Sequence, residues 1–139
     1  MKINHDASMF SECVFLGGTC ATSTWRQELI PMLADRVPYF NPQLGVGEWN
    51  DEAAAAENAC KGEAKLQVYV LTPEGVGWRS LFEMGQTSAK LGRRMIFAAI
   101  GVEIDKAMKW NIADMREDGV IICETLEEVA AAVNACYPE

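Results

Sequence analysis

The sequence predicts an α/β fold in which helices cover both faces of a parallel sheet. Short apolar runs alternate along the chain with longer segments of helical periodicity, which is typical of strands joined by helical crossovers. The segment LQVYVLT at residues 66–72 contains the β-branched Val68 and Val70 within an apolar run. Such a run fits a strand that is buried on both faces, as in parallel sheets covered by helices.

The first strand is expected at residues 13–16, directly before Gly17 and Gly18. A helix should begin after Thr24, because Thr24 and Gln27 form the T-x-x-Q pattern of a capping box. The core-facing side of this helix is expected to carry residues at spacing i, i+4 and i+8, namely Trp25, Leu29 and Leu33.

The middle of the chain supplies two more strands and two more helices. A short strand at residues 39–41 ends before Pro42, which cannot donate to a strand ladder. A helix containing the alanine run 53–56 should follow, because alanine has the highest helix propensity. After the strand at 66–72, a turn leads into a further helix at 79–92.

The last third continues the alternation. Strands are expected at residues 95–100 and 119–123, with helices at 104–116 and after Thr125, whose T-x-x-E pattern forms a second capping box. The inward side of the last helix is expected to carry Leu126, Val129, Ala130 and Val133. Five strands in this alternation predict a flavodoxin-like three-layer sandwich with a parallel sheet of order 2-1-3-4-5. In that order the loops after strands one and three flank the switch point, where ligands bind.

Length and charge limit the classes of function. At 139 residues the chain is expected to form one domain over residues 1–139, with a flexible N-terminus at 1–11. Lys and Arg number 12 against 20 Asp and Glu, a formal net charge of −8 without a basic stripe. Binding to intact nucleic acid through its phosphates is therefore not expected, whereas a small anionic nucleotide can be held locally.

The cysteines and the single histidine argue against a metal site. The 5 cysteines include no C-x-x-C pair, and the one histidine is His5, so neither a zinc site nor a disulfide framework is predicted. Unpaired cysteines, without a signal peptide or a long apolar span, indicate a cytoplasmic protein that does not enter a membrane. Cys13 and Cys123 fall in expected strands, where a thiol acts as a small apolar side chain.

Glu83 is the main candidate for chemistry. It lies near the start of the helix after residues 66–72, where backbone N–H groups and the helix dipole favour an ionised carboxylate. An ionised carboxylate at the mouth of a cleft can act as a nucleophile. From spacing alone the alternative stays open that Glu83, Gln86, Thr87 and Lys90 form the solvated face of the helix.

Gly17, Gly18 and Thr19 are expected to form the loop after the first strand. The glycines would let a ligand approach the backbone closely, and Arg26 adds a cation that can seat a sugar hydroxyl or a phosphate. The pattern is neither G-x-G-x-x-G nor a P-loop, so dinucleotide cofactors and P-loop phosphate transfer are not predicted. The alternative is that these residues only make the turn and cap the helix.

Two tryptophans and several polar residues belong to loops expected at the same edge of the sheet. Trp49 and Trp78 can stack a nucleobase, and the Asn41 amide can read its edge. Gly77 permits a sharp turn ahead of Ser80, which can cap the helix or contact a phosphate. The alternative for both tryptophans is a role as hydrophobic plugs.

A second carboxylate would complete a glycosidic site. Cleavage at a glycosidic carbon normally uses one carboxylate as nucleophile and a second acidic group that protonates the departing base. The candidates for this second group are Glu52, Glu57 and Glu74. The alternatives are a solvated turn residue for Glu74 and a surface helix position for Glu57.

Several motifs follow one another in a fixed order: FLGGT, TWR, YFNP with a following Trp49, and YVLTPEGVGWRSLFEMG. With these motifs, residues 13–100 resemble the nucleoside 2-deoxyribosyltransferases and related nucleotide N-glycoside hydrolases. The resemblance implies a flavodoxin-like fold and a glutamate nucleophile, Glu83 in this chain, that attacks the anomeric carbon. It also implies that Glu57 is the acidic residue of the helix before the third strand, that no cofactor is needed, and that the protein forms homo-oligomers.

The resemblance assigns the substrate site as well. By position, the residues that line it correspond to Gly17, Gly18, Asn41 and Ser80. Many transferases have an aspartate where this chain has Gly77, and another where it has Lys65. The expected function is cleavage or transfer at the N-glycosidic bond of a small-molecule nucleoside or nucleotide through a covalent glutamyl-sugar intermediate. Because of Gly77, the alternative is a non-catalytic nucleotide-binding or sensing domain.

Overall fold

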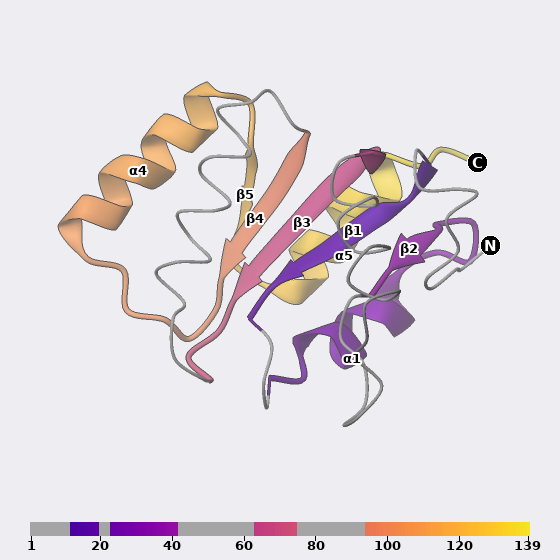
Figure 1. Ribbon diagram of the computed structural model, residues 1–139, viewed down its shortest axis with the longest axis horizontal. Helices are drawn as coiled ribbons and strands as arrows, with labels where there is room; N and C mark the ends of the chain where they lie inside the picture. The colour runs from indigo at the N-terminus through magenta and orange to yellow at the C-terminus, as the bar shows by residue number, and fades with distance from the viewer. Residues whose placement is uncertain (1–11, 20–22, 42–62, 75–93) are drawn as a thin grey trace.

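The computed structural model describes residues 12–19, 23–41, 63–74 and 94–139 (Figure 1). Their strands form a five-stranded parallel sheet in the order β2-β1-β3-β4-β5, which confirms the predicted order. The strands are β1 Val14–Gly18, β2 Tyr39–Phe40, β3 Leu66–Leu71, β4 Met95–Ala99 and β5 Ile121–Cys123. The helices given for these residues are α1 Trp25–Leu29 with the 3-10 turn η2 Ile30–Met32, α4 Lys106–Glu117 and α5 Leu126–Ala135.

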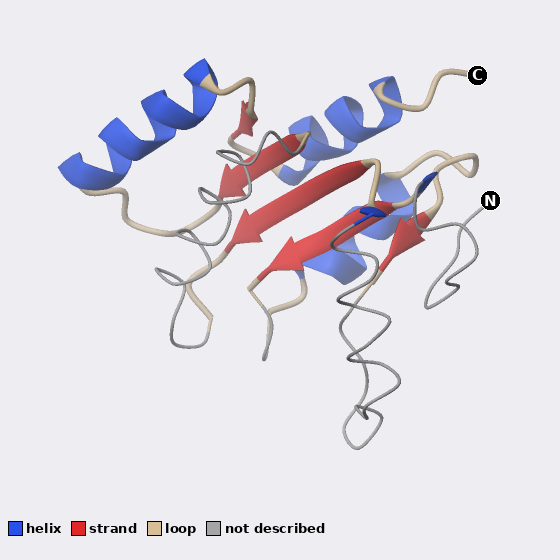
Figure 2. Cartoon of the chain, turned by 45° about the horizontal axis from the view of Figure 1, so that its top comes forward, coloured by secondary structure: helices blue, strands red, loops and turns tan. Residues whose placement is uncertain are grey.

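Apolar clusters lie on both faces of the sheet, so the described residues form three layers. Figure 1 shows α5 passing behind the strands, and Figure 2 shows the same sheet from a tilted direction. On that face, side chains of β1, β3 and β4 pack against α1 and α5. On the opposite face, Tyr69, Leu71 and Phe97 pack against Met108 and Met115 of α4. This is the flavodoxin-like arrangement.

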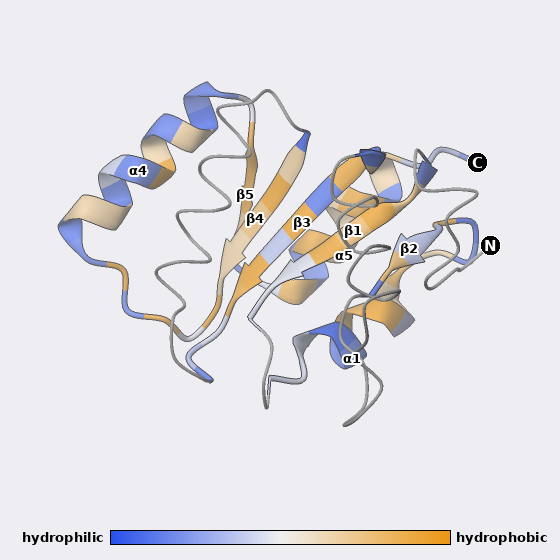
Figure 3. Ribbon diagram, in the orientation of Figure 1, coloured by the Kyte–Doolittle hydropathy of each residue, from blue (hydrophilic) through white to orange (hydrophobic). Residues whose placement is uncertain are grey.

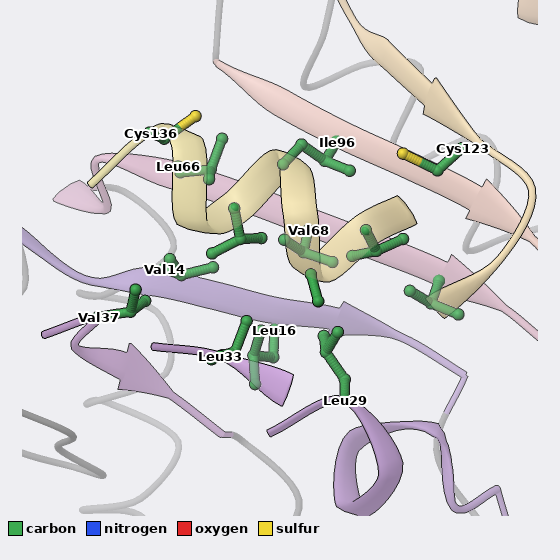
Figure 4. Packing of buried hydrophobic residues seen from close by; sticks show 14 of the residues in the cluster. Val14, Leu16, Leu29, Leu33, Val37, Leu66, Val68, Ile96, Cys123 and Cys136 are labelled. Atoms are coloured by element: carbon green, nitrogen blue, oxygen red, sulfur yellow. The ribbon is translucent and has the colours of Figure 1, made fainter. Parts of the chain in front are cut away.

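The two central strands are buried along their whole length. Every residue of β1 and of β3 is buried. Each strand is paired on both edges, and its side chains pack in the apolar clusters on the faces of the sheet. Figure 3 shows these strands as largely hydrophobic, and Figure 4 shows Val14, Leu16 and Val68 pointing into the cluster beneath α5. Burying such side chains stabilises the fold by about 1.5–3 kcal/mol each, so the sheet centre is the rigid base of the site.

Helix α1 begins without the predicted capping box. The side chain of Thr24 makes no capping hydrogen bond; its hydroxyl lies 3.4 Å from Oε2 of Glu28 instead. The reason is the backbone of Thr24, with φ −107° and ψ 11°, since a capping side chain needs an extended residue to reach back. The predicted inward side is confirmed, because Trp25, Leu29 and Leu33 are all buried.

The second capping box is confirmed in its main hydrogen bond. Thr125 has an extended backbone, and its hydroxyl accepts from the Glu128 amide at 3.1 Å. The Glu128 carboxylate in turn accepts from the amide of Glu124 at 3.0 Å. The predicted inward residues of α5 pack as expected, with Val129, Ala130 and Val133 buried and Leu126 partly buried against the same cluster.

Two predicted strand boundaries are wrong by two residues, and the others differ from the structure by at most one. β1 continues through Gly17 and Gly18, which were expected to lie in a loop. β5 begins only at Ile121, because Gly119 adopts φ +91° and its amide bonds to the Arg116 carbonyl at 3.0 Å. A glycine in this conformation ends a helix, so Gly119 belongs to the end of α4 and not to the strand.

Some predictions fall on residues outside the described ranges. These are the flexible N-terminus at 1–11, the helix around 53–56 and the helix at 79–92. Among the residues that are described, no helix combines the length and the hydrophobicity that a membrane span requires. The expectation of a single domain over residues 1–139 stays a prediction.

Candidate functional site

The ends of β1 and β3 are joined by hydrogen bonds between two threonines. The Thr72 amide donates to Oγ1 of Thr19 at 2.9 Å, and the same hydroxyl donates to the Thr72 carbonyl at 3.3 Å. The Thr19 amide donates to the Val70 carbonyl at 3.0 Å. Thr19 and Thr72 are both buried. The two loops that flank the switch point are therefore held together where a ligand of this fold class binds.

A chain of hydroxyl groups leads outward from this connection. Oγ of Ser23 lies 2.8 Å from Oγ1 of Thr72, and a hydrogen bond from Thr72 holds the pKa of the exposed Glu74 below its usual value. Either of the two hydroxyl groups can donate in the bond between Ser23 and Thr72. Because its pKa is lowered, Glu74 is an ionised acceptor at neutral pH. A lowered pKa makes it a poor proton donor for a departing base.

Arg26 lies inside the protein and not on the rim of the site. Its side chain is 1% exposed, and its guanidinium donates to the backbone carbonyls of Leu16 at 3.0 Å, Thr19 at 2.8 Å and Gly18 at 3.5 Å. The guanidinium carbon lies 4.4 Å from the centre of the Trp25 ring. These contacts give Arg26 a positioning role at the end of β1, whereas its predicted contact with a phosphate stays a prediction.

Trp25 acts on the same carbonyl group. Its Nε1 donates to the Thr19 carbonyl at 2.8 Å, so this oxygen accepts from both Trp25 and Arg26. Hydrogen bonds from a cation to backbone oxygens are stronger than neutral ones. The backbone of Thr19, directly after β1, is therefore held in place by the buried side chains of Trp25 and Arg26.

The two glycines have packing roles that the sequence did not indicate. A Cβ on Gly17 would lie 3.0 Å from atoms of the Phe15 and Tyr69 rings, so neighbouring rings occupy the space that a side chain at this position would need. Gly18 has φ +118°, and a Cβ there would lie 2.2 Å from the Val70 carbonyl oxygen. Both glycines are explained by close approach within the sheet, and their predicted contact with the sugar stays a prediction.

Asn41 follows directly after β2 and is partly buried. Because β2 pairs with β1 in parallel, through Tyr39 with Val14 and Phe40 with Phe15, Asn41 leaves the sheet at the same edge as Thr19. The structure thus brings five polar residues to one edge: Thr19, Ser23, Asn41, Thr72 and Glu74.

The other predicted site residues lie outside the described ranges. They are the two catalytic candidates Glu57 and Glu83 and the substrate-site candidates Trp49, Gly77, Trp78 and Ser80. Glu52, the remaining candidate for a second acid, lies outside them as well. Their roles stay predictions.

Thr72 is the residue that sequence reasoning missed. It forms the centre of the hydroxyl chain, although its position at the end of LQVYVLT suggested only a strand terminus. The available signal was a hydroxyl residue at the carboxyl end of each of two adjacent buried strands. In a parallel sheet such residues meet at one edge.

The described cysteines carry no sign of a reactive group. Cys13, Cys123 and Cys136 are buried and form no disulfide, and burial, followed by the charge of Glu128, raises the pKa of the Cys123 thiol. Within the described ranges no group of three or more His, Cys, Asp or Glu is placed to hold a metal ion. Their thiols therefore serve as apolar side chains in the core.

The sheet order defines a flavodoxin-like α/β protein, and the polar residues gathered where β1 and β3 end mark a candidate site at the switch point. A family model described as nucleoside 2-deoxyribosyltransferase like matches residues 11–101, and the chain belongs to that family. No curated protein matches the chain. The matched segment extends from β1 through β4 and includes both Glu57 and Glu83. Membership suggests an enzyme that acts on a small-molecule nucleoside.

Proposed function

We propose that this protein cleaves or transfers the N-glycosidic bond of a (2-deoxy)nucleoside or nucleotide through a covalent glutamyl-sugar intermediate. The observation that carries the proposal is the family match over residues 11–101. The hydrogen bonds between Thr19 and Thr72 support it, because they fix Thr72, the residue after β3 from which the chain continues toward Glu83. The finer details of the mechanism rest on residue types and positions.

In the proposed first step, the Glu83 carboxylate attacks C1′ of the sugar. A C1′–O ester bond forms, the C1′–N bond breaks, and its electron pair moves to the base, which takes a proton from the carboxyl group of Glu57. The charge of Glu83 also stabilises the oxocarbenium character of the transition state. Glu57 is the preferred donor over Glu74, whose pKa is lowered by Thr72.

In the second step, a nucleophile enters from the face that the base left, opposite Glu83, and the C1′–O bond breaks to release the Glu83 carboxylate. Water gives hydrolysis and a free sugar, whereas the nitrogen of a second base gives transfer and a new nucleoside. The Glu57 carboxylate takes the proton of the incoming group and returns to its starting state. Trp49 and Trp78 are proposed to stack the base, and no metal or organic cofactor takes part.

The test is the release of free base from a panel of deoxynucleosides and nucleoside monophosphates, measured for the wild type and for Glu83→Ala. We expect Glu83→Ala to lose base release at least a hundredfold, because without the nucleophile the covalent route is closed. Glu127→Ala, which removes an exposed carboxylate on α5, is the matched control and should leave release unchanged. Equal release by Glu83→Ala and wild type would end the catalytic claim. Adding a second base distinguishes transfer from hydrolysis.

One departure from the family pattern favours a second candidate function. Gly77 stands where many transferases have an aspartate, and a chain without that carboxylate can keep the pocket while losing turnover. The second candidate is a domain that binds or senses nucleotides without cleaving them. Calorimetric binding of a nucleotide, with no base released over prolonged incubation, would favour it over the enzyme.

A further inference from the structure

Trp110 is the most exposed of the large hydrophobic side chains in the described ranges, with 72% of its surface accessible. Tryptophan is on average a well-buried residue, so this exposure needs a reason. Trp110 lies on α4, whose buried side carries Met108 and Met115 against the sheet. Figure 3 shows α4 as a mostly hydrophilic helix, so the indole stands out from charged surroundings.

Trp110 belongs to a stripe of exposed residues on the side of α4 that faces away from the sheet. Lys106, Trp110, Ala113 and Glu117 recur at spacings of four, three and four residues and are all exposed, so they lie along one side of the helix. We call these four residues the α4 stripe. Lys106 and Glu117 lie about 16 Å apart along the axis, too far to pair within one chain.

The α4 stripe is complementary to itself when it is reversed. Around the point midway between Trp110 and Ala113, the cation at position 106 mirrors the anion at 117, and the large indole mirrors a small methyl group. A two-fold axis at this point places each Trp110 over Ala113 of the second copy, and each Lys106 opposite Glu117. Symmetric interfaces between identical chains require this kind of self-complementarity, and the spacing is that of paired helices.

The surface of α4 around Trp110 is open to a second helix. A wide, shallow depression of about 570 Å³ lies along this helix, and the residues that line it are Lys109, Trp110, Asn111, Ala113, Asp114 and Glu117. An indole buries a large apolar area when it is covered. The indole of a second copy, placed over Ala113, would lie against this shallow surface with charged side chains around it.

We propose that α4 is an interface at which two copies of the chain associate in antiparallel orientation through the α4 stripe. A contact formed by one helix per copy is smaller than a standard interface. In this orientation Lys109 of one copy approaches Arg116 of the second on one flank, and like charges weaken association. The dimer is therefore weak and forms with rising concentration. The proposal does not depend on catalysis by Glu83.

The first test is sedimentation velocity on the full chain from about 10 μM to about 1 mM, the range in which weak complexes form. We expect the average mass to rise from 15.3 kDa toward twice that value. Trp110→Glu should weaken association at least tenfold. The control is Met32→Glu, which changes another exposed hydrophobic residue, outside α4, and should associate as the wild type does. A wild-type mass of 15.3 kDa over the whole range would overturn the proposal.

The second test exchanges the charges of the α4 stripe. Lys106→Glu and Glu117→Lys each place like charges opposite one another twice per dimer, so each variant alone should remain monomeric. An equal mixture of the two restores both attractive pairs, and the doubly substituted chain restores them within a homodimer, so both should associate like the wild type. Far-UV circular dichroism checks that each variant is folded. Single variants that associate as the wild type does, or a mixture that does not associate, would overturn the proposal.

Discussion

Replacing Gly18 by alanine should destabilise the protein more than any other single methyl addition at the described glycines. Gly18 has φ +118°, and a Cβ built on it lies 2.2 Å from the Val70 carbonyl oxygen and 2.7 Å from the Val70 nitrogen. The clash is with backbone atoms of the neighbouring strand, which cannot rotate away. Alanine must therefore change the backbone angle of Gly18 or separate the ends of β1 and β3.

The magnitude follows from two effects. A positive φ costs an alanine about 1–2 kcal/mol, and forcing an extra methyl group into a packed interior costs about 1–3 kcal/mol more. We therefore expect Gly18→Ala to lower the free energy of unfolding by about 2–5 kcal/mol, a large part of the roughly 5–15 kcal/mol that holds a typical domain together. The hydrogen bond from the Thr19 amide to the Val70 carbonyl should break first, because it lies directly beside the added methyl group.

Gly119→Ala separates the two effects. Gly119 also has a positive φ, at +91°, but nothing lies within 4 Å of a Cβ there. This variant should show only the conformational part of the destabilisation, about 1–2 kcal/mol. Urea titrations of the wild type and both variants, followed by circular dichroism, give the free energies. If Gly18→Ala were no less stable than Gly119→Ala, the close approach of Gly18 to Val70, and with it the extended β1, would be refuted.

Two further predictions concern ionisable groups. Thr72→Val should cost about 1 kcal/mol through removal of the hydrogen bond with Ser23 and should return the pKa of Glu74 toward its usual 4.5. Because the folded pKa of Glu74 is lowered, its contribution to stability is present above pH 4.5 and is lost as the pH falls through the folded pKa. NMR titration of Glu74 in the wild type and in Thr72→Val would contradict the role of Thr72 if both proteins gave the same pKa. Burial is the largest cause that raises the pKa of Tyr137 above its usual 10.0. The contribution of Tyr137 to the free energy of unfolding is therefore fully present below pH 10.0 and is lost as the pH rises further. Tyr137→Phe should remove most of this loss of stability at alkaline pH, although it also removes the hydrogen bond to the Glu12 carbonyl. Urea titrations in buffers of rising alkaline pH would disprove the claim if the wild type and the variant lost stability in parallel.

The order of the sheet could be predicted because its causes are local and strong. β3 is buried at every residue, and only a strand covered on both sides carries such a run. The boundaries at glycines were harder to predict. Gly18 ends a strand and Gly119 ends a helix. From the sequence alone each glycine fits a turn as well as a strand, because the sequence does not show which backbone segment lies next to it.

The position of the switch point could be predicted from the sequence, whereas the hydrogen bonds formed there could not. The sequence places the loops after β1 and β3 beside the switch point, and the bonds between Thr19 and Thr72 are in accord with that. Arg26 was expected near a ligand because it is a cation close to the start of the helix after the first strand. Its burial against three carbonyl groups depends on how the chain bends after β1, which spacing along the sequence does not encode. The same holds for Thr24, whose capping pattern failed because of its own backbone angles.

The pairing of β1 with β3 has a consequence for how the protein is made. Val14 is aligned with Leu66 and Gly18 with Val70. More than fifty further residues must therefore be synthesised after each residue of β1 before its partner residue in β3 leaves the ribosome. Until then the one strand paired with it among the described residues is the two-residue β2, and a short two-stranded pair is not stable in water. The nascent chain therefore carries an apolar segment without its partner for several seconds at ordinary rates of synthesis. During that interval the apolar β1 segment is a binding site for chaperones, and slow translation just before β3 would prolong its exposure.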